Sequence, residues 1–415
     1  MRVLWFSNCV LGNSISKGSG SWLFAMSKLI CNSLELYNAT NSPVDSITTK
    51  EYDTFKEILV PRYKTFNGIP EEKNIAAIQK MIEEIKPDII HIWGLENIWG
   101  TLYTKGFIKG KVILEIQGLM QPCYDSFWGG LNPIKLFFTS LCVRNFIYPG
   151  SGLLSQKRSF KDASRQSENV LVHCAAVSTQ SNWVRHQIGF VINEKCRVYK
   201  TLRPIRNEFW EATPWVSHNG GCKIFTSLSY YLPFKGVHIL IKALSLLKQK
   251  YNNVTLEIAG VTEQDLIWYR QFGYLKYLKL LAKKRGVLDN IVFVGRLNAQ
   301  QIIEHLLSCD VFVNPSFVES YSASTAEALA LGVPTVTAYA GAMPDFSKNG
   351  SVALYYSPMD YTDCASKIQT LIENTEIRDD LRKNAKKEIM EMCGSDNVRS
   401  TQLAIYEDMI KTEFA

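Results

Sequence analysis

The sequence predicts an α/β protein in which two Rossmann-like domains face each other across a cleft. Three observations favour this fold class. The chain has 415 residues, which is long for one domain and sufficient for two domains with full hydrophobic cores. Apolar strand patterns alternate with amphipathic helix patterns in both halves, as in parallel sheets covered by helices. Between the halves, residues 212–221 (ATPWVSHNGG) are rich in turn formers and interrupt the alternation.

The first alternating series starts at the N-terminus. RVLWFSN predicts a buried strand, and a loop rich in glycine and serine separates it from the helical pattern WLFAMSKLICNSLELY. Residues 71–86 have apolar positions at helical spacing and acidic residues in the first turn, and Pro87 ends this predicted helix. DIIHIWG and KVILEIQG predict buried parallel strands. After an aromatic segment that the pattern does not assign (119–150), the series continues with NVLVHCAAVST and CRVYKTL.

The second series is the more regular one. Its predicted strands are CKIFTSLS, VTLEIAG, NIVFVGRL, DVFVNPS and PTVTAYA, and its predicted helices are VHILIKALSLLKQKY, 275–285, AQQIIEHLLSC and 322–332. From about residue 362 the pattern is helical and amphipathic. We therefore expect an N-terminal domain (1–205), a linker (206–221), a C-terminal domain (222–390) and a final helix (391–415) that crosses back to the N-terminal domain. Ligands of such sheets bind beyond the carboxyl ends of the strands, so the cleft is the expected site.

Composition excludes several classes of protein. A hydrophobic fraction of 46% and a charged fraction of 20% are typical of a folded globular chain and not of a disordered one. The net charge of +7 is mild and lacks the concentrated basic stripe of a nucleic-acid-binding protein. The ten cysteines form no CxxC pair, so the sequence predicts neither a zinc site nor a disulfide framework, and we expect a cytoplasmic location.

The sequence contains no obvious membrane-spanning segment. No stretch approaches the roughly 20 apolar residues that such a helix needs, and the apolar run at the N-terminus is too short for a signal peptide. The most apolar segment is IKLFFTSLCVRNFIYPG (134–150), which Arg144 interrupts. A buried or cleft-lining position is the simpler interpretation of this segment, and peripheral contact with the inner membrane surface is the alternative.

Charged residues gather where predicted strands of the second series end. Lys235 and Gly236 stand just before a helix, where a lysine and free N–H groups can hold a phosphate. A surface lysine beside a helix start is the alternative interpretation. Arg296 follows the strand NIVFVGRL. Glu319 and Glu327 stand eight positions apart, the first in a loop ahead of a nearly uncharged helix and the second in its early turns.

Taken in order, these features resemble a retaining GT-B glycosyltransferase of family 4 (glycosyl transferases group 1). The resemblance rests on Lys235-Gly236, the strand DVFVNPS, the Glu–X7–Glu spacing of Glu319 and Glu327, and EALALGVPTV with the downstream AGAMPD. It is close over most of residues 222–360, whereas the first half matches mainly in strand order and in the glycine loop after the first strand. The spacing of the two glutamates alone is common, but the ordered set in these contexts is specific.

The resemblance implies a role for each matched residue. Glu319 would hold the hydroxyls of the donor sugar and Glu327 the ribose, because a carboxylate can accept two hydroxyl hydrogen bonds. Lys235 would stabilise the diphosphate, to which Ser320, Tyr321 and Ser322 would present backbone N–H groups at the helix start. Tyr321 makes this loop bulkier than is usual in the family and could restrict the sugar. The resemblance implies no cofactor and no metal, and a UDP-sugar is the expected donor.

The sequence departs from the family at two further positions. The arginine that usually precedes the lysine by five residues is Tyr230 here, and Arg203, Arg206 and Arg296 are candidate substitutes. The histidine usual after the strand VILEIQG is Gln117, which can hydrogen-bond but cannot act as a general base. The resemblance implies retaining transfer without a strong protein base, because the leaving phosphate can take the proton of the acceptor. Gln117 is therefore compatible with catalysis alongside Glu319 and Lys235.

The first half supplies candidates for the acceptor side. His91 lies mid-strand and is interpreted as a core histidine. Trp93, Glu96 and Asn97 stand at the carboxyl end of the same strand and are the candidate acceptor contacts. Gly18, with Gly20, follows the first strand, where a glycine loop lets the backbone approach the donor phosphates or the acceptor. The spacing is not GxGxxG, so no dinucleotide site is predicted there.

These expectations combine into one predicted function with two alternatives. The prediction is a hexosyltransferase-type enzyme (EC 2.4) that moves a sugar, with retention, from a nucleotide diphosphate sugar to a hydroxyl of a glycan or lipid-linked glycan, in bacterial surface polysaccharide synthesis. Residues 222–390 would bind the nucleotide sugar and residues 1–205 the acceptor. A sugar-nucleotide epimerase shares the two-domain shape but lacks the Glu–X7–Glu and Lys-Gly arrangement. A non-catalytic partner that binds a nucleotide sugar or a glycan would account for Tyr230 and Gln117.

Overall fold

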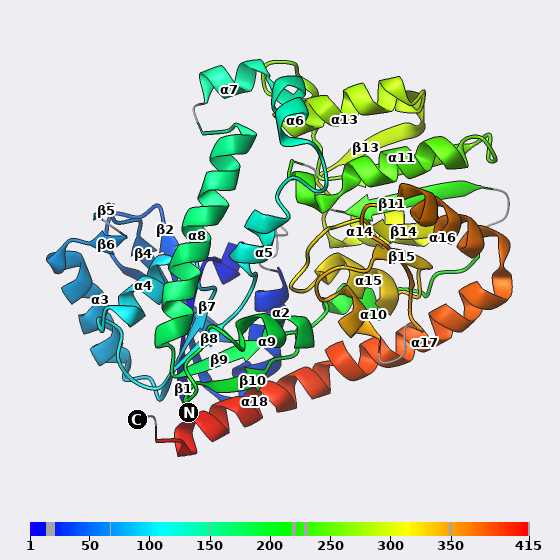
Figure 1. Ribbon diagram of the computed structural model, residues 1–415. Coiled ribbons are helices and arrows are strands. Elements are labelled where there is room, and N and C mark those ends of the chain that lie inside the picture. The colour runs from blue at the N-terminus through cyan, green and yellow to red at the C-terminus, as the bar shows by residue number, and fades with distance from the viewer. Residues whose placement is uncertain are drawn as a thin grey trace. The chain divides into compact units, whose positions relative to one another are not determined.

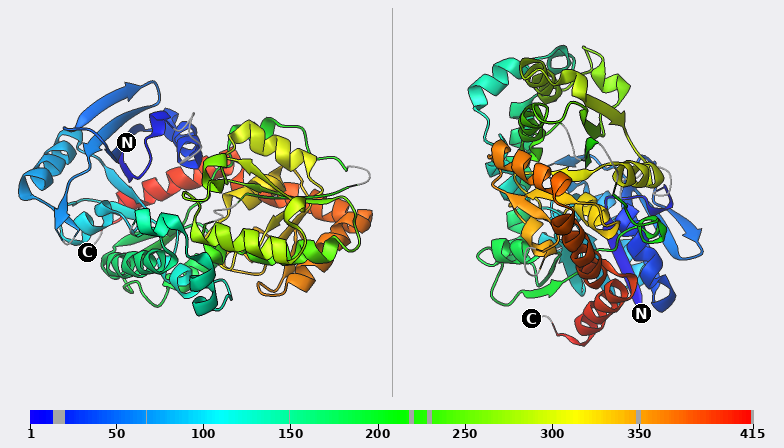
Figure 2. Two further views of the ribbon diagram at one scale, coloured as in Figure 1. Left: turned by 90° about the horizontal axis from the view of Figure 1, so that it is seen from above. Right: turned by 90° about the vertical axis from the view of Figure 1, so that its right-hand side faces the viewer.

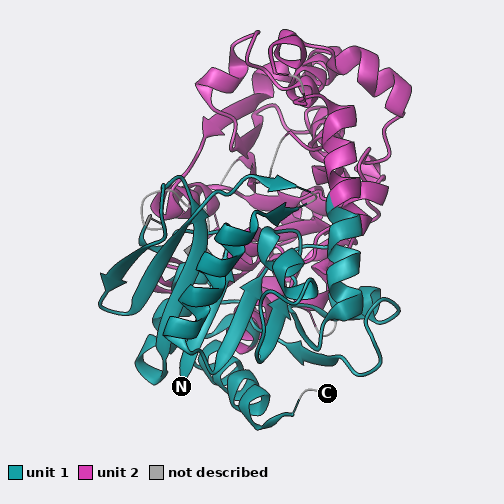
Figure 3. Ribbon diagram, turned by 90° about the vertical axis from the view of Figure 1, so that its left-hand side faces the viewer, with its two compact units in different colours: residues 1–119, 163–206, 392–415 teal, residues 120–162, 207–391 magenta. Residues whose placement is uncertain are grey.

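The computed structural model describes residues 1–13, 21–66, 68–148, 150–217, 221–227, 231–347 and 351–413. The chain divides into two compact units, which Figure 3 colours separately. Unit 1 consists of residues 1–119, 163–206 and 392–415, and unit 2 consists of residues 120–162 and 207–391. The chain therefore enters and leaves each unit more than once.

Unit 1 is built on an eight-stranded sheet (Figure 1). In spatial order its strands are β10 (Arg197–Lys200), β9 (Ala176–Thr179), β8 (Val112–Glu115), β7 (Ile89–Trp93), β1 (Arg2–Ser7), β2 (Glu35–Ser42), β4 (Phe55–Pro61) and β3 (Thr48–Tyr52). Every neighbouring pair is parallel except β3 with β4. Strand β7 is buried along its whole length, as a parallel strand covered on both faces must be.

Helices cover both faces of this sheet. Successive residues of β1 alternate between two hydrophobic clusters, Leu4 and Phe6 in one and Val3 and Trp5 in the other, because side chains of a strand point to opposite faces. The first cluster includes residues of α3 (Glu72–Ile85), α4 (Ile98–Thr104) and α9 (Asn182–Ile188). The second includes residues of α2 (Ser21–Ile30) and α18 (Ser395–Lys411).

Two segments named in the first series differ from the sequence prediction, and β3, β4, α4 and α9 were not predicted. The helix expected over WLFAMSKLICNSLELY ends at Ile30, and after a short 3-10 turn Glu35–Ser42 forms β2. Pairing with β1 and β4 on its two sides outweighs the local helical spacing of this segment. The segment NVLVHCAAVST divides between the end of α8 (Leu153–His173) and β9.

Residues 120–162 belong to unit 2, although the sequence boundaries assign them to the N-terminal domain. They form α5 (Met120–Asp125), α6 (Pro133–Ser140), α7 (Val143–Ile147) and the start of α8. Helix α6 packs on α13 (Gly273–Lys284), where a Cβ on Gly273 would lie 2.3 Å from the carbonyl oxygen of Ser140. The interpretation of 134–150 as a buried segment is wrong for several residues, since Ile134, Phe138 and Phe146 are 71%, 66% and 79% exposed.

Unit 2 is built on a six-stranded parallel sheet. Its order is β13 (Ile291–Gly295), β12 (Val254–Ala259), β11 (Cys222–Ser227), β14 (Val311–Asn314), β15 (Thr335–Ala338) and β16 (Leu354–Tyr356). All five predicted strands are present, and β16 is additional. The chain runs outward from β11 to β12 and β13 and then returns to β14 on the other side of β11. Strands β11 and β14 therefore flank a topological switch point, where open α/β sheets bind ligands.

The remaining helices of unit 2 follow the predicted segments. They are α11 (Val237–Leu247), α14 (Ala299–Ser308), α15 (Ala323–Ala330), α16 (Tyr361–Glu373) and α17 (Thr375–Cys393), with the short α10 (Asn207–Glu211) and α12 (Glu263–Leu266) not predicted. Helix α18 belongs to unit 1, where it packs beside α2 (Figure 2) and Tyr406 accepts a hydrogen bond from Trp5 Nε1 at 2.9 Å. Within the described ranges, every helix is too short or too polar to cross a membrane.

Candidate active site

The loop between β14 and α15 is held by one buried asparagine. The Nδ2 of Asn314 donates to Ser322 Oγ at 2.9 Å and to Thr325 Oγ1 at 3.0 Å. Its Oδ1 accepts from the backbone N–H of Ser316 at 3.1 Å. Ser322 in turn caps α15 by accepting from the backbone N–H of Thr325 at 3.3 Å. The strand end, the loop and the helix start are thereby fixed to one another.

Glu319 lies in this loop and meets Lys235 directly. Lys235 Nζ donates to Glu319 Oε1 at 2.6 Å, and Ser316 Oγ donates to the same oxygen at 2.7 Å. The lysine side chain is 17% exposed and the glutamate side chain 10% exposed, so this ion pair is largely shielded from water. The structure thus brings together, at the switch point, the residues that the sequence placed after β11 and after β14.

Two glycines allow this close approach. Gly236 has φ of 73°, and a Cβ there would lie 1.9 Å from the carbonyl oxygen of Pro315. Gly341 lies in the turn after β15, and a Cβ there would lie 2.3 Å from the carbonyl oxygen of Glu319. The backbone N–H of Ala342 donates to that same carbonyl at 2.8 Å. Gly341 and Ala342 are part of the AGAMPD motif, which therefore acts by supporting the backbone of Glu319.

The segment 120–162 also borders the site, through residues outside 134–150, the part for which the sequence suggested a buried or cleft-lining position. A Cβ on Gly129 would lie 2.5 Å from the carbonyl oxygen of Pro233, in the 3-10 turn that ends at Lys235. His238 is buried and joins Gly129 to α13, with Nε2 3.0 Å from the Gly129 carbonyl and Nδ1 2.7 Å from the Tyr274 hydroxyl. Burial lowers the pKa of His238 to about 3, and the neighbouring Lys242 contributes to that lowering. His238 is therefore a neutral structural residue.

Cys123 on α5 is a site neighbour that sequence reasoning missed. Burial raises the pKa of its thiol to about 12, and its thiol lies near enough to Lys235 and Glu319 to be affected by both charges. The protonated thiol carries no charge and does not compete for the lysine. The aromatic segment that contains Cys123 has no periodicity by which its approach to the lysine could have been predicted.

The other donor-side candidates differ in position. Ser320 and Glu327 are buried, with 9% and 8% of their surface exposed, and Glu327 lies in the second turn of α15. The ring of Tyr321 packs against Phe346 with centroids 5.3 Å apart. Arg296 is exposed and follows β13, which two strands separate from β14, so the two strand ends are roughly 14 Å apart. The structure does not place Arg296 with the Lys235–Glu319 pair.

The acceptor-side candidates lie in unit 1 and only some are accessible. Trp93 is fully buried, stacks on His91 with ring centroids 3.9 Å apart and touches Trp5 edge-on, so its assignment to a ligand-accessible position is wrong. Asn97 is the N-cap of α4, since its Oδ1 accepts from the backbone N–H of Gly100 at 3.2 Å. Glu96 is half-buried, and burial raises the pKa of its carboxyl group.

The remaining unit 1 candidates come from β7, from the loop after β8 and from the segment that ends at Arg206. His91 is fully buried, as expected, and its Nδ1 lies 2.8 Å from the Tyr406 hydroxyl. Gln117 is half-buried in the loop after β8. Arg203 is 8% exposed, with its guanidinium 4.0 Å from the centroid of the Trp22 ring, and Arg206 is half-buried at the end of this unit. Three further residues singled out in the sequence, Gly18, Gly20 and Tyr230, lie outside the described residues.

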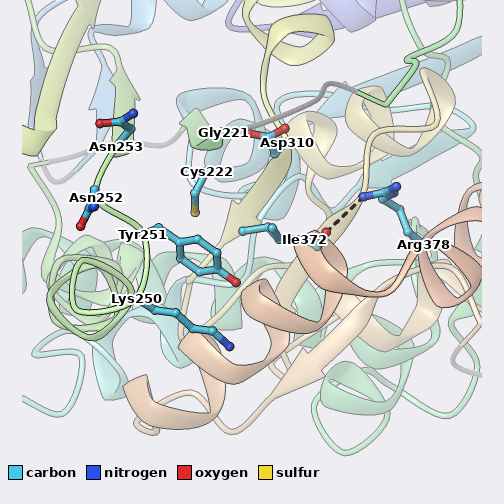
Figure 4. Close-up of a pocket in the computed structure, with 9 residues that line it drawn as sticks. All are labelled: Gly221, Cys222, Lys250, Tyr251, Asn252, Asn253, Asp310, Ile372 and Arg378. Carbon is cyan, nitrogen blue, oxygen red and sulfur yellow. Dashed lines mark hydrogen bonds between the residues drawn. The ribbon is translucent and has the colours of Figure 1, made fainter.

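A cavity of about 400 Å³ lies at the amino ends of strands in the unit 2 sheet, opposite to the ends that carry Lys235 and Glu319 (Figure 4). It is lined by Cys222, which begins β11, and by Asp310, which precedes β14, so it adjoins the amino ends of these strands. Its two cations are engaged, because Lys250 Nζ lies 2.7 Å from Glu373 Oε1 and Arg378 Nη1 donates to the Ile372 carbonyl at 3.5 Å. This cavity is distinct from the Lys235–Glu319 pair. In the part of the chain that the structure describes, no cluster of three His, Cys, Asp or Glu residues could hold a metal ion.

Comparison with known proteins finds similarities in part of the chain. Residues 210–388 match the family described as Glycosyl transferases group 1. The chain is 35% identical over 100 residues to a sulfoquinovosyl transferase of Arabidopsis thaliana, covering 23% of this chain and 20% of that one. It is 31% identical over 141 residues to a glycogen synthase of Mycobacterium tuberculosis, covering 34% and 31%. These two matches span less than a third of each relative, and the family match lies in the second half of the chain.

Solved structures resemble the whole chain in fold. A sucrose-phosphate synthase of Thermosynechococcus elongatus covers 100% of both chains with a TM-score of 0.73 and 13% identity. The Anabaena protein HepE, in complex with UDP-glucose, covers 98% of this chain and 100% of its own with a TM-score of 0.67 and 15% identity. The fold is GT-B, with two Rossmann-like α/β halves, as the sequence predicted.

Proposed function

We propose that this chain is a retaining glycosyltransferase of family 4 that transfers a sugar from a UDP-sugar to a hydroxyl of a glycan or lipid-linked glycan. The observation that carries the proposal is the Lys235–Glu319 pair at the switch point of unit 2, beside the start of α15. The match of residues 210–388 to glycosyl transferases group 1 supports the reaction class. The binding of UDP-glucose by Anabaena HepE, whose fold is similar, supports the choice of donor.

The donor diphosphate is assigned to the start of α15. The first backbone N–H groups of a helix lack intrahelical acceptors and favour an anion, and Ser320, Tyr321 and Ser322 supply the approach to that helix. Lys235 adds a positive charge on the same side of the sheet. Negative charge grows on the departing diphosphate in the transition state, so a cation fixed in a site of low exposure lowers the barrier there.

The two glutamates are assigned to the two ends of the donor. Glu319 accepts hydrogen bonds from hydroxyls of the transferred sugar, and Glu327, in the second turn of α15, accepts from the ribose. Ser316 and Lys235 both donate to Oε1 of Glu319, whereas none of the described residues donates to its Oε2. That second oxygen is the one we assign to the sugar.

The transfer step uses the substrates themselves as acid and base. The bond between the sugar C1 and the diphosphate oxygen breaks with development of oxocarbenium character, and the departing phosphate oxygen takes the proton of the acceptor hydroxyl. The acceptor oxygen then bonds to C1 on the face from which the diphosphate leaves, so the configuration is retained. Gln117 is assigned a hydrogen bond to the reacting groups, which needs no ionisation of its side chain.

The acceptor is assigned to unit 1. Among the unit 1 candidates, Gln117 and Glu96 are partly exposed and are retained, whereas Trp93 and Asn97 serve the core and a helix cap. We assign the protein to the cytoplasmic side of bacterial surface polysaccharide synthesis. A capsular polysaccharide glycosyltransferase of Staphylococcus aureus, 25% identical over 178 residues, supports this assignment.

The test measures release of UDP. The protein is incubated with UDP-sugars, with and without glycan and lipid-linked glycan acceptors, and free UDP and the anomeric configuration of the product are measured. Acceptor-dependent release that a Lys235→Ala variant loses supports the proposal. Nucleotide-sugar binding that depends on Lys235 but gives no turnover would identify a non-catalytic binding protein, and an altered sugar still attached to the nucleotide would identify an epimerase.

A further inference from the structure

Exposed apolar residues gather on neighbouring segments of unit 2. Ile134 and Phe138, one helical turn apart on α6, are 71% and 66% exposed. Phe146 at the end of α7 is 79% exposed, and Trp268 just after α12 is 71% exposed. Single exposed apolar residues are ordinary on a protein surface, but a group of this size indicates an interaction surface. We call the surface formed by α6, α7 and residues 267–270 the basic-apolar face.

Specific contacts hold these segments together. Arg144 of α7 donates from Nη1 to the carbonyl of Arg270 at 3.0 Å, and Cys142 Sγ lies 3.1 Å from the carbonyl of Gln271. Lys276 Nζ on α13 donates to the carbonyl of Leu141 at 2.6 Å. Figure 1 shows α6 beside α13. The exposed apolar residues are therefore carried by a folded platform, in which the segments before α7 and before α13 are pinned to each other.

The charge on this platform has one sign. Residues 126–161 contain five cations, Lys135, Arg144, Lys157, Arg158 and Lys161, and no aspartate or glutamate. Residues 266–288, which include α13, contain six cations, Arg270, Lys276, Lys279, Lys283, Lys284 and Arg285, and again no acidic residue. The chain as a whole has 46 basic and 39 acidic residues, so an even mixture would have placed several acids in these stretches. On the basic-apolar face itself, α6, α7 and residues 267–270 carry the cations Lys135, Arg144 and Arg270 and no acidic residue, whereas Glu263 and Asp265 lie just before it on α12. The face is therefore positive within its own segments.

Exposed aromatic and aliphatic side chains beside cations are typical of a surface that binds a membrane. We propose that the basic-apolar face binds the surface of a membrane that contains anionic lipids. The rings of Phe138, Phe146 and Trp268 would enter the boundary between headgroups and acyl chains, and cations such as Lys135 would meet the anionic headgroups. The guanidinium of Arg144 lies 4.0 Å from the Phe272 ring centroid and 5.2 Å from that of Tyr148, so it packs on both rings.

Charge also argues against a second copy of the chain as the occupant. A symmetric dimer through this face would place the same cations opposite one another, since each subunit of such a pair presents the same patch. Like charges brought together in an interface oppose association. This proposal does not depend on the transfer reaction, so lipid binding and nucleotide binding can be measured and can fail separately.

Vesicle co-sedimentation tests the proposal with the full chain. The wild type should sediment with vesicles of phosphatidylcholine and phosphatidylglycerol but not with phosphatidylcholine alone, and added NaCl should weaken the binding. The double variant Phe138→Ser/Phe146→Ser should bind at least tenfold more weakly, and Lys135→Glu should bind several-fold more weakly. Phe190→Ser is the matched control, because Phe190 is fully exposed but lies in unit 1. It should bind like the wild type.

Thermal unfolding and UDP binding show whether the variants are folded. Because the substituted side chains are exposed, both measurements should match those of the wild type. Failure of the folded wild type to bind phosphatidylglycerol vesicles would overturn the proposal, and so would binding that the Phe138→Ser/Phe146→Ser variant retains. Concentration-dependent self-association that this variant abolishes, without lipid binding by the wild type, would instead identify a second copy as the occupant.

Discussion

Lys235 Nζ lies 2.6 Å from Glu319 Oε1, so the cation assigned to the diphosphate is paired with the carboxylate assigned to the sugar. The pair joins the loops that follow β11 and β14, on the two sides of the switch point. A diphosphate that approaches Lys235 must share it with Glu319. Sugar hydroxyls that approach Glu319 donate hydrogen bonds to its carboxylate. These bonds replace part of the interaction that the carboxylate loses when Lys235 turns to the diphosphate. Binding of the two parts of the donor is therefore expected to be coupled.

The ion pair should contribute measurably to stability. Lys235→Met leaves a largely buried carboxylate without its cation, and Glu319→Gln leaves the cation without its carboxylate, so each should lower the free energy of unfolding by about 1–3 kcal/mol. The double variant should lose clearly less than the sum of the two single losses, as urea denaturation would measure. The exposed pair Lys80–Glu84, at 3.8 Å, is the control and should show coupling of about 0.5 kcal/mol or less. Additive losses at Lys235 and Glu319 would contradict a coupled pair.

Glu319→Ala should reduce the rate of transfer. The variant loses the acceptor assigned to the sugar hydroxyls, and charge-assisted hydrogen bonds of this kind correspond to about tenfold or more in kcat/KM. Initial rates of UDP release measure the effect. Glu304→Ala, which changes an exposed glutamate on α14, is the control and should leave the rate unchanged. Full activity in the Glu319→Ala variant would remove Glu319 from the proposed mechanism.

Gly236→Ala should lower the free energy of unfolding by more than the backbone strain of a positive φ. An alanine at φ of 73° costs about 1 kcal/mol, and its Cβ would also lie 1.9 Å from the Pro315 carbonyl oxygen. Gly286 separates the two effects, because it has φ of 68° and a Cβ added there would have no heavy atom within 4 Å. Gly286→Ala should cost only the backbone strain, whereas Gly236→Ala should cost more and should also weaken UDP binding. Equal losses in chemical denaturation would show that the loops move apart freely.

The second half of the chain was predictable because local and long-range signals agree there. Strands such as DVFVNPS are short apolar runs bounded by turn residues, and each lies between helices with clear 3.6-residue spacing. The position of Lys235 just before α11 and that of Glu319 just after β14 follow from those boundaries. Their 2.6 Å contact does not, because it depends on the order in which β11 and β14 pair within the sheet.

The first half was less predictable because tertiary pairing decides its local structure. The predicted helical pattern runs on to Tyr37, yet Glu35–Ser42 becomes β2 because β1 and β4 supply hydrogen bonds on both sides. Residues 120–162 have no clear periodicity, so neither their helices nor their place in unit 2 could be assigned. Trp93 stands at a strand end, where ligands commonly bind, but its ring is enclosed by three aromatic neighbours, His91, Trp5 and Trp22.

Asn97 should behave as a helix cap. Its Oδ1 accepts from the Gly100 N–H at 3.2 Å, and Asn97→Ala should lower the free energy of unfolding by about 1 kcal/mol. Asn97→Ser retains a capping oxygen and should recover most of that loss. Urea denaturation measures the free energy of unfolding of both variants. The KM for acceptor of each variant should equal that of the wild type. A higher KM for acceptor in the Asn97→Ser variant would support the prediction from the sequence that Asn97 contacts the acceptor.

Glu115 should make the stability of the protein depend on pH. Its side chain is fully buried at the end of β8, where burial raises its pKa to about 7, although Ser178 and Gln180 donate hydrogen bonds to it and Arg203 lies near. The folded state therefore holds a proton that the unfolded chain releases near pH 4.5. Stability from this group is fully present below about pH 4.5 and is lost as the pH rises through about 7. The shift corresponds to about 3 kcal/mol.

A Glu115→Gln variant isolates this effect, because glutamine keeps the shape of the protonated acid and cannot ionise. The difference in unfolding free energy between the variant and the wild type should grow in favour of the variant from acid to mildly alkaline pH, by up to about 3 kcal/mol. Burial lowers the pKa of neighbouring His91 to about 3, which destabilises the folded state as the pH falls below about 6.5. Both proteins contain His91, so its contribution cancels in the difference. A difference that stays constant with pH would mean that Glu115 is ionised in the folded protein and is compensated by Arg203.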